Sequence, residues 1–141
     1  MPSQPPLSPP ASAMTEACWD LPHSAEAAGL ARQLTRQTLA MWEIAPPLSD
    51  NIQLIVSELV TNALVHAHPP ICLSLHWTEG YVRGEVFDTG PLCPLIPRRP
   101  DDTELSGRGL ATIDALADKW GVDPSPLADG KTVWFLYSAR P

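Results

Sequence analysis

The segment from residue 50 to residue 66 carries the clearest periodic pattern in the sequence. Its apolar residues recur at three- and four-residue spacing, which places them on one side of an α-helix and requires that side to be buried. These positions are Ile52, Ile55, Val56, Leu59, Val60, Ala63 and Leu64. We predict that the helix begins near Ser49 or Asp50, with Asp50 and Gln53 as a capping box, and ends at His66.

Another helix is predicted ahead of it, after a short strand at residues 15–21. Ser24 is the expected N-cap, and the helix runs to about Trp42, because the prolines at 46 and 47 lack the backbone N–H that would extend it. Its apolar stripe is expected to comprise Ala27, Leu30, Ala31, Leu34, Thr38 and Met41.

The second half of the chain is predicted to hold most of the strands. Alternating apolar residues predict strands at 71–77 and 81–88, and a third helix opens at Gly107 after the loop-like residues 89–106. A short strand is predicted at 120–122 and a final strand at 131–138. This order favours an α/β (α+β) two-layer sandwich, in which helices cover one face of a mixed, mainly antiparallel sheet. We expect residues 1–14 to be a disordered proline-rich leader and residues 15–141 to be one domain.

The composition restricts the partners and the compartment. The formal net charge is −7, which disfavours direct binding to nucleic acid. Apolar runs stay far below the roughly 20 residues that cross a bilayer, and no secretory signal follows Met1, so we expect a cytoplasmic protein without a membrane anchor. Cys18, Cys72 and Cys93 are widely spaced, which is typical of reduced thiols rather than of disulfides or a zinc site.

Three short motifs carry polar residues that could serve a ligand. Glu58 and Asn62 are one helical turn apart, so the carboxylate could accept a proton and the amide oxygen could bind Mg²⁺. Asp88 ends a strand, and the Gly107–Gly109 segment opens a helix whose free N–H groups favour anions. Each motif alone also fits a simpler interpretation: a solvated helix flank, a plain turn, and a flexible loop. No G-x-S-x-G hydrolase elbow is present in the sequence.

Taken in order, the motifs resemble those of the GHKL (Bergerat-fold) ATPases, and within them the anti-sigma-factor serine kinases and their actinobacterial relatives. The stretch VSELVTNALVHA at 56–67 resembles the N box, and VFDTG at 86–90 resembles the G1 box. SGRGL at 106–110 resembles the G2 box, and GKTVWF at 130–135 resembles the closing strand. The resemblance covers about residues 15–140.

This resemblance implies a role for each matching residue in binding Mg²⁺ and ATP. Glu58 would be the catalytic general base, Asn62 the Mg²⁺ ligand, and Asp88 the acceptor for the adenine amino group. Thr132 would support Asp88 and a water in the adenine site. The remaining residues expected around the nucleotide are His66, Gly90, Gly107, Arg108, Gly109 and Leu110.

The resemblance implies a protein serine/threonine kinase that acts on an anti-sigma-antagonist protein, with a sigma factor as a second candidate partner and a homodimer as a candidate assembly. One departure supports an alternative. The G1 box commonly reads D-x-G-x-G, whereas Pro91 and Leu92 follow Gly90 here. The alternative is a non-catalytic module that binds ATP or ADP and regulates a partner by binding only. A detached catalytic domain of a sensor histidine kinase fits less well, because no helix pair carries a phosphoacceptor histidine.

Overall fold

Five strands form one sheet in the order β1-β2-β3-β5-β4 in a computed structural model, which describes residues 15–89, 104–125 and 130–139. Every pairing between these strands is antiparallel. The prediction of a mainly antiparallel sheet is therefore confirmed, without any parallel pair among the described strands. The strands are β1 (Glu16–Leu21), β2 (Ile71–Thr78), β3 (Tyr81–Asp88), β4 (Lys119–Pro124) and β5 (Lys131–Ser138).

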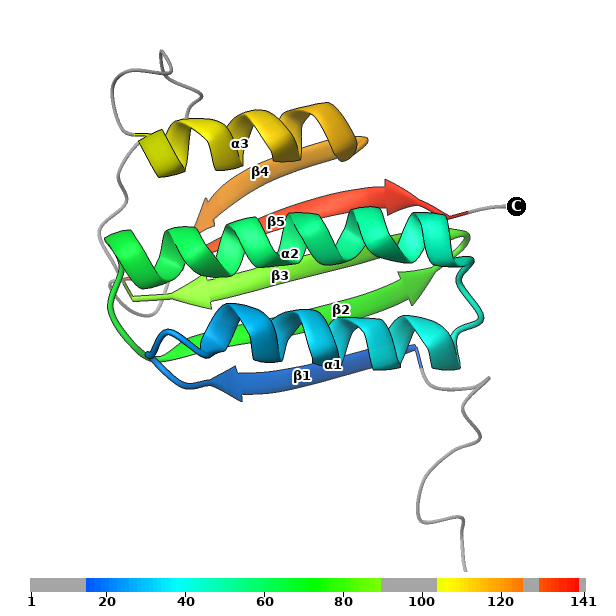
Figure 1. The fold of residues 1–141 in the computed structure, drawn as a ribbon, viewed down its shortest axis with the longest axis horizontal. Coiled ribbons are helices and arrows are strands. Elements are labelled where there is room, and N and C mark those ends of the chain that lie inside the picture. The colour runs from blue at the N-terminus through cyan, green and yellow to red at the C-terminus, as the bar shows by residue number, and fades with distance from the viewer. Residues whose placement is uncertain (1–14, 90–103, 126–129, 140–141) are drawn as a thin grey trace, which may run out of the picture.

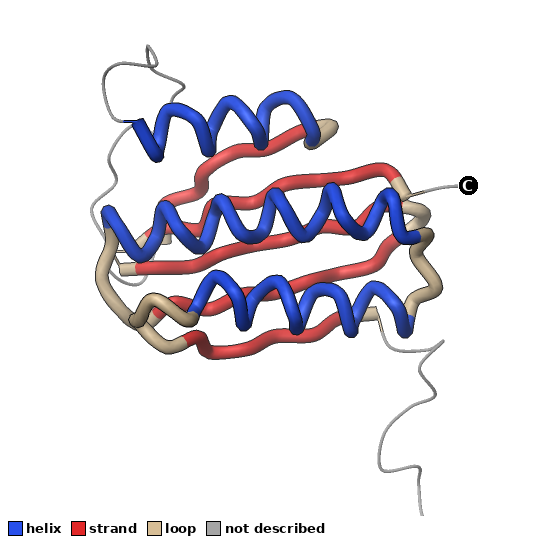
Figure 2. Tube along the Cα trace, viewed as in Figure 1, coloured by secondary structure: helices blue, strands red, loops and turns tan. Residues whose placement is uncertain are grey.

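Three helices cover one face of this sheet (Figure 1): α1 (Ala27–Met41), α2 (Pro46–His66) and α3 (Glu104–Leu116). Figure 2 shows the helices as one layer in front of the strands. The middle helix, α2, packs against both other helices and against β3. The two-layer architecture expected from the sequence is thus confirmed, and none of the described helices is long and apolar enough to cross a membrane.

The core lies between α2 and the centre of the sheet. Side chains on β2, β3 and β5 alternate between buried and half-buried, as expected for strands with one face under helices. All of the predicted apolar positions of α2 are buried except Leu64, which is partly exposed. The fully buried large side chains include Ile52, Ile55, Val56, Val60, Leu73, Leu75, Val82, Val86 and Phe135.

The predicted start of α2 is wrong by one turn. The helix begins at Pro46, and Ala45 is an N-cap without a side-chain bond. Proline suits the first helical turn because its fixed φ is already helical and its missing N–H needs no partner there. Instead of closing a capping box with Asp50, Gln53 donates its side-chain Nε2–H to Ser49 Oγ at 3.0 Å.

The predicted cap of α1 is also wrong. The helix begins at Ala27, and the Ser24 hydroxyl donates to the Glu26 carboxylate at 2.7 Å instead of accepting from a helix N–H. The buried stripe is rotated from the predicted one, because Met41 is 41% exposed while Thr35 is fully buried. Because Thr35 is polar, the prediction from apolar spacing did not include it in the buried stripe.

The β2–β3 hairpin turns at the predicted residues. Glu79 and Gly80 both have positive φ, 53° and 86°, which is the conformation that two-residue hairpin loops favour. The turn fixes the register in which Gly84 of β3 faces Phe135 of β5. A Cβ atom on Gly84 would lie 2.1 Å from Phe135 Cε1, and the phenyl ring is fully buried. Glycine is therefore needed at this position for the central strands to pack.

We expect Gly84→Ala to lower the free energy of unfolding by roughly 1–3 kcal/mol, because the added methyl group overpacks the core against Phe135. Urea unfolding followed by circular dichroism measures the change. Gly29→Ala in α1 is the matched control, since the nearest atom to its added Cβ is Arg32 Nη2 at 3.8 Å. We expect that substitution to raise stability by roughly 0.5–1 kcal/mol through helix propensity. Equal stability of Gly84→Ala and wild type would contradict the packing argument.

Candidate functional site

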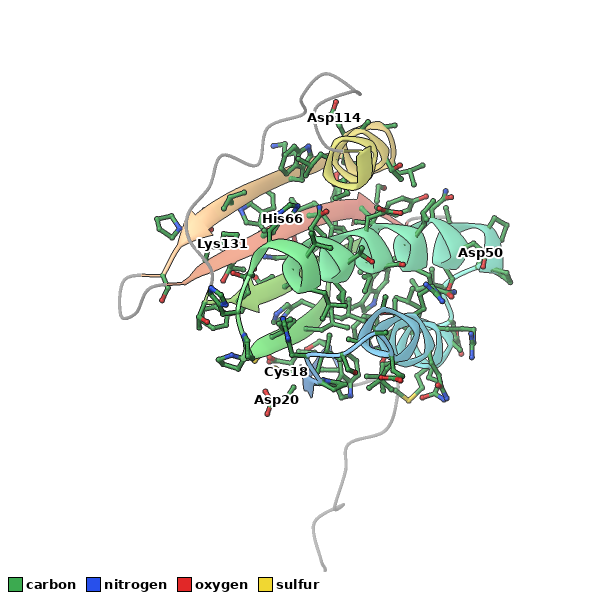
Figure 3. All side chains as sticks on the ribbon, turned by 60° about the vertical axis from the view of Figure 1, so that its left-hand side comes forward. Cys18, Asp20, Asp50, His66, Asp114 and Lys131 are labelled. Carbon is green, nitrogen blue, oxygen red and sulfur yellow. The ribbon has the colours of Figure 1, made fainter. Side chains whose placement is uncertain are left out.

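A small cavity lies where the C-terminal part of α2 meets the ends of β3 and β5. Its volume is about 10 Å³, and α3 contributes the side chain that completes it. Figure 3 shows His66 and Lys131 at this end of α2, with Asp50 at the opposite end. The lining residues are Leu59, Asn62, Ala63, His66, Val86, Asp88, Leu110, Lys131 and Val133. Residues of the predicted N box, G1 box and G2 box therefore meet residues of the closing strand at this cavity.

A buried ion pair in this cavity joins Asp88 and Lys131. Lys131 Nζ donates to Asp88 Oδ1 at 2.8 Å, and the two side chains are only 5% and 2% exposed, respectively. The residues are direct partners in the β3–β5 register, and both lie on the helix-facing side of the sheet. Two opposite charges at this burial depend on each other, because an unpaired buried charge is strongly unfavourable.

Lys131 is the functional candidate that the sequence reasoning missed. Thr132 was expected to support Asp88, but it is half-buried on the opposite face of β5, where it pairs with Phe87. Strict alternation along β5 was the signal that could have found the lysine. It places residue 131 on the same face as Val133 and Phe135, and the register between β3 and β5 then sets it beside Asp88.

Asn62 lines the same cavity and has an unsatisfied amide nitrogen. The residue is 8% exposed, and its Nδ2 atom has no hydrogen-bond partner among the described residues. Buried polar atoms are nearly always paired, so an orphaned amide in a cavity indicates a position for a ligand. The oxygen and nitrogen of an amide are interchangeable by a flip, so either atom can face the cavity.

The donor set fits Mg²⁺ only if a ligand supplies further oxygens. An amide oxygen such as that of Asn62 is a suitable hard ligand, and protein-bound Mg²⁺ usually keeps several waters and phosphate oxygens. No group of three or more His, Cys, Asp or Glu side chains stands ready for a metal within the part of the chain that the structure describes. Asn62 would therefore hold the ion together with a polyphosphate rather than alone.

Glu58 lies one turn before Asn62 on α2 but outside the cavity lining. Its side chain is half-buried, on the flank of the apolar stripe as the spacing predicted. His66 lies one turn after Asn62, is exposed, and forms part of the cavity rim. The helix thus presents Asn62 inside the cavity, with Glu58 and His66 on either side of it along the helix.

The end of β3 is tied to the segment that follows α2. The Thr89 N–H donates to the carbonyl of His68 at 3.2 Å, and the Thr89 hydroxyl donates to the carbonyl of Pro69 at 2.8 Å. These bonds tie the residue after Asp88 to the segment that follows the helix carrying Asn62.

The third helix begins one turn before the predicted start at Gly107. The α3 backbone is helical from Glu104, so Gly107 and Gly109 lie inside the helix rather than before its first residue. Good helix formers on both sides of the glycines outweigh the cost of about 1 kcal/mol for each glycine. Gly90 and the side chain of Arg108 lie outside the described residues. Leu110 is 3% exposed and closes the cavity from the α3 side.

A larger hollow of about 500 Å³ lies on the other face of the sheet, near the β2–β3 turn. Its size is typical of ligand pockets. However, two of its charged groups already engage each other: Arg83 pairs with Glu85 at 2.6 Å and also lies over the Trp134 ring at 4.7 Å. The unsatisfied amide nitrogen and the buried ion pair belong to residues that line the small cavity, so the small cavity is the better candidate for a ligand site than the larger hollow.

The cysteines offer no competing site among the described residues. Cys18 and Cys72 are free thiols, and Cys93 lies outside the description. Burial, followed by the hydrogen bond to Asp20, raises the pKa of the Cys72 thiol to about 11. This thiol therefore stays protonated at neutral pH, which makes it a poor nucleophile and a poor metal ligand.

Comparison with known proteins agrees with this geometry. Residues 21–136 match the family model of the histidine kinase-like ATPase domain. The Streptomyces coelicolor protein SCO4941 is 46% identical over 46 residues, which are 32% of this chain and 44% of that protein. The chain therefore matches less than half of the length of that relative.

Two solved structures share the fold. The structure of the RsbU and RsbW domains of Rv1364c from Mycobacterium tuberculosis matches with a TM-score of 0.69 at 23% identity, over 91% of this chain and 34% of that one. The blue-light activated histidine kinase of Erythrobacter litoralis EL346 matches with a TM-score of 0.52 at 24% identity, over 68% of this chain and 32% of that one. The family match spans most of the chain and the fold agrees with it, so the chain belongs to the histidine kinase-like ATPase domain family, which implies that it binds ATP.

Proposed function

We propose that this domain binds Mg-ATP in the cavity between α2, β3, β5 and α3, and uses it to regulate a partner protein. The observation that carries the proposal is the unsatisfied amide of Asn62 in the same cavity as the buried carboxylate of Asp88. The carboxylate accepts from the amino group of the base, and the amide oxygen binds Mg²⁺ on the phosphate side. Apolar residues such as Val86 and Val133 supply the walls for the ring.

The cavity has to open for this function. A volume of about 10 Å³ holds about one water, far less than a purine ring needs. Leu110 is the lining residue from α3, so outward movement of this helix makes room while the α2 and sheet walls stay in place. Gly107, Arg108 and Gly109 lie in the first turns of the same helix, and in the open form they line the triphosphate.

We further propose that the protein is a serine/threonine kinase acting on an anti-sigma-antagonist protein, with a sigma factor as a second candidate partner. The support is the resemblance of four motifs to the anti-sigma-factor kinases and the shared fold with an RsbW-domain structure. Glu58 is the general base in this proposal, because it lies one helical turn from Asn62 and therefore close to the phosphates. Phosphoryl transfer needs mainly positioning, charge neutralisation and such a base.

A second candidate function is regulation by nucleotide binding alone. Two features favour it: proline and leucine at 91 and 92 in place of the usual second glycine, and the engagement of Asp88 by Lys131. The first stiffens the chain after Gly90, and the second gives the adenine amino group a competitor for the carboxylate. Both affect how the nucleotide is held rather than whether the fold forms.

Nucleotide binding is tested by calorimetric titration with ATP in the presence and absence of Mg²⁺. We expect wild type to bind, omission of Mg²⁺ to weaken binding, and Asp88→Asn to weaken it roughly 10- to 100-fold, because the charged acceptor of a buried bond is lost. Circular dichroism checks that this variant, which leaves Lys131 buried without its counter-charge, is folded. Asp50→Asn, at the far end of α2, is the control and should bind as wild type does. Purine riboside triphosphate, which lacks the amino group, checks the same contact without a mutation. Absence of ATP binding at millimolar concentration would refute the proposal.

The kinase proposal is tested with labelled ATP and candidate anti-sigma-antagonist proteins. We expect Glu58→Gln to lower the rate of phosphoryl transfer by roughly 100-fold or more, as for loss of a general base, while ATP affinity stays within about two-fold of wild type. Asp50→Asn again serves as the control on the same helix. Undiminished transfer by Glu58→Gln would exclude it as the base. ATP binding without any transfer by wild type would select the binding-only function.

A further inference from the structure

Lys131 lines the same cavity as Asp88. The two groups come from neighbouring strands, are direct register partners, and lie 2.8 Å apart. Together they place a hydrogen-bond acceptor and a donor side by side in the lining of the cavity. A base edge that carries a donor next to an acceptor is the chemical complement of this pair.

We propose that Lys131 is a specificity-determining residue of the base site, donating a hydrogen bond to the N1 ring nitrogen of adenine while Asp88 accepts from the adjacent amino group. This inference rests on the proposed ATP binding. An ammonium group donates up to three hydrogen bonds, so one ring nitrogen competes for a donor without breaking the bond to Asp88. Lys131 thereby acts on the choice of base, in addition to neutralising the carboxylate.

Burial makes this contact selective. Lys131 and Asp88 are 5% and 2% exposed, and the walls around them include Leu59, Val86 and Val133. Hydrogen bonds are stronger in such a setting, and a base that leaves a buried charged group without a hydrogen-bond partner binds with lower affinity. Adenine presents its donor and its acceptor in one order along the edge, whereas guanine presents an acceptor and a donor in the reverse order. Because the strand register fixes the order of Asp88 and Lys131, we expect adenine to be preferred.

If Lys131 served only as a counter-ion for Asp88, the affinity for the nucleotide would not depend on the ring nitrogen N1. The deciding probe is therefore 1-deazaadenosine triphosphate, which keeps the amino group and replaces N1 by a C–H group. We expect wild type to bind it roughly 10- to 100-fold more weakly than ATP in calorimetric titrations with Mg²⁺, as for loss of a bond to a charged donor. GTP should bind more weakly than ATP by at least a similar factor.

The variant Lys131→Met/Asp88→Asn removes both charges together, so that no unpaired buried charge threatens folding. We expect it to bind ATP and 1-deazaadenosine triphosphate with equal affinity, because the donor to N1 is absent. Lys119→Met removes an exposed lysine of β4 and should keep the wild-type preference. Circular dichroism checks that each variant is folded.

The outcomes separate this inference from the proposed function. Failure of wild type to bind ATP refutes both. Binding of ATP with equal affinity for the 1-deaza analogue or for GTP overturns the role of Lys131 and leaves ATP binding intact. A preference for N1 that persists in the double variant also overturns it, while loss of the preference in that variant alone supports it.

Discussion

The packing of α2 against the centre of the sheet is the interaction on which the rest of the structure depends. Ile52, Ile55 and Val56 fill the space above the central strands, and Phe135 closes it from below. The same helix face continues to Asn62, and the strand faces that pack against it end at Asp88 and Lys131. The candidate site is therefore the polar end of the hydrophobic core, held in place by the same register and the same helix.

Polar residues occur in this end of the core at positions where the pattern calls for apolar ones. On β3, Asp88 follows Val82 and Val86 on the buried face; on β5, Lys131 precedes Val133 on the buried face. A buried ion pair adds little stability over apolar residues of similar volume, because desolvation offsets the attraction. Stability alone gives no reason for this pair, whereas recognition of a polar ligand does.

Long periodic segments made most of the fold predictable. The α2 stripe and the strands at 71–78, 81–88 and 131–138 each repeat one pattern over several turns or pleats, and all four were confirmed. Helix ends were less predictable because Ser24 could bond another side chain and Pro46 could enter a first turn. Asp88 pairs with Lys131, 43 residues further along the chain, because of the register between β3 and β5. Motif resemblance alone does not give this register.

The position of Leu110 connects the closed cavity to the residues expected to meet phosphate. Leu110 closes the cavity at 3% exposure, and Gly107 and Gly109 lie just before it in the first turns of α3. Two glycines each cost a helix about 1 kcal/mol relative to alanine, so this part of α3 is the least stable part of the helix. In the proposed function, unwinding of these turns would release Leu110 and free backbone N–H groups to meet phosphate. The proposed role of the glycine segment at the triphosphate therefore requires the start of α3 to unwind.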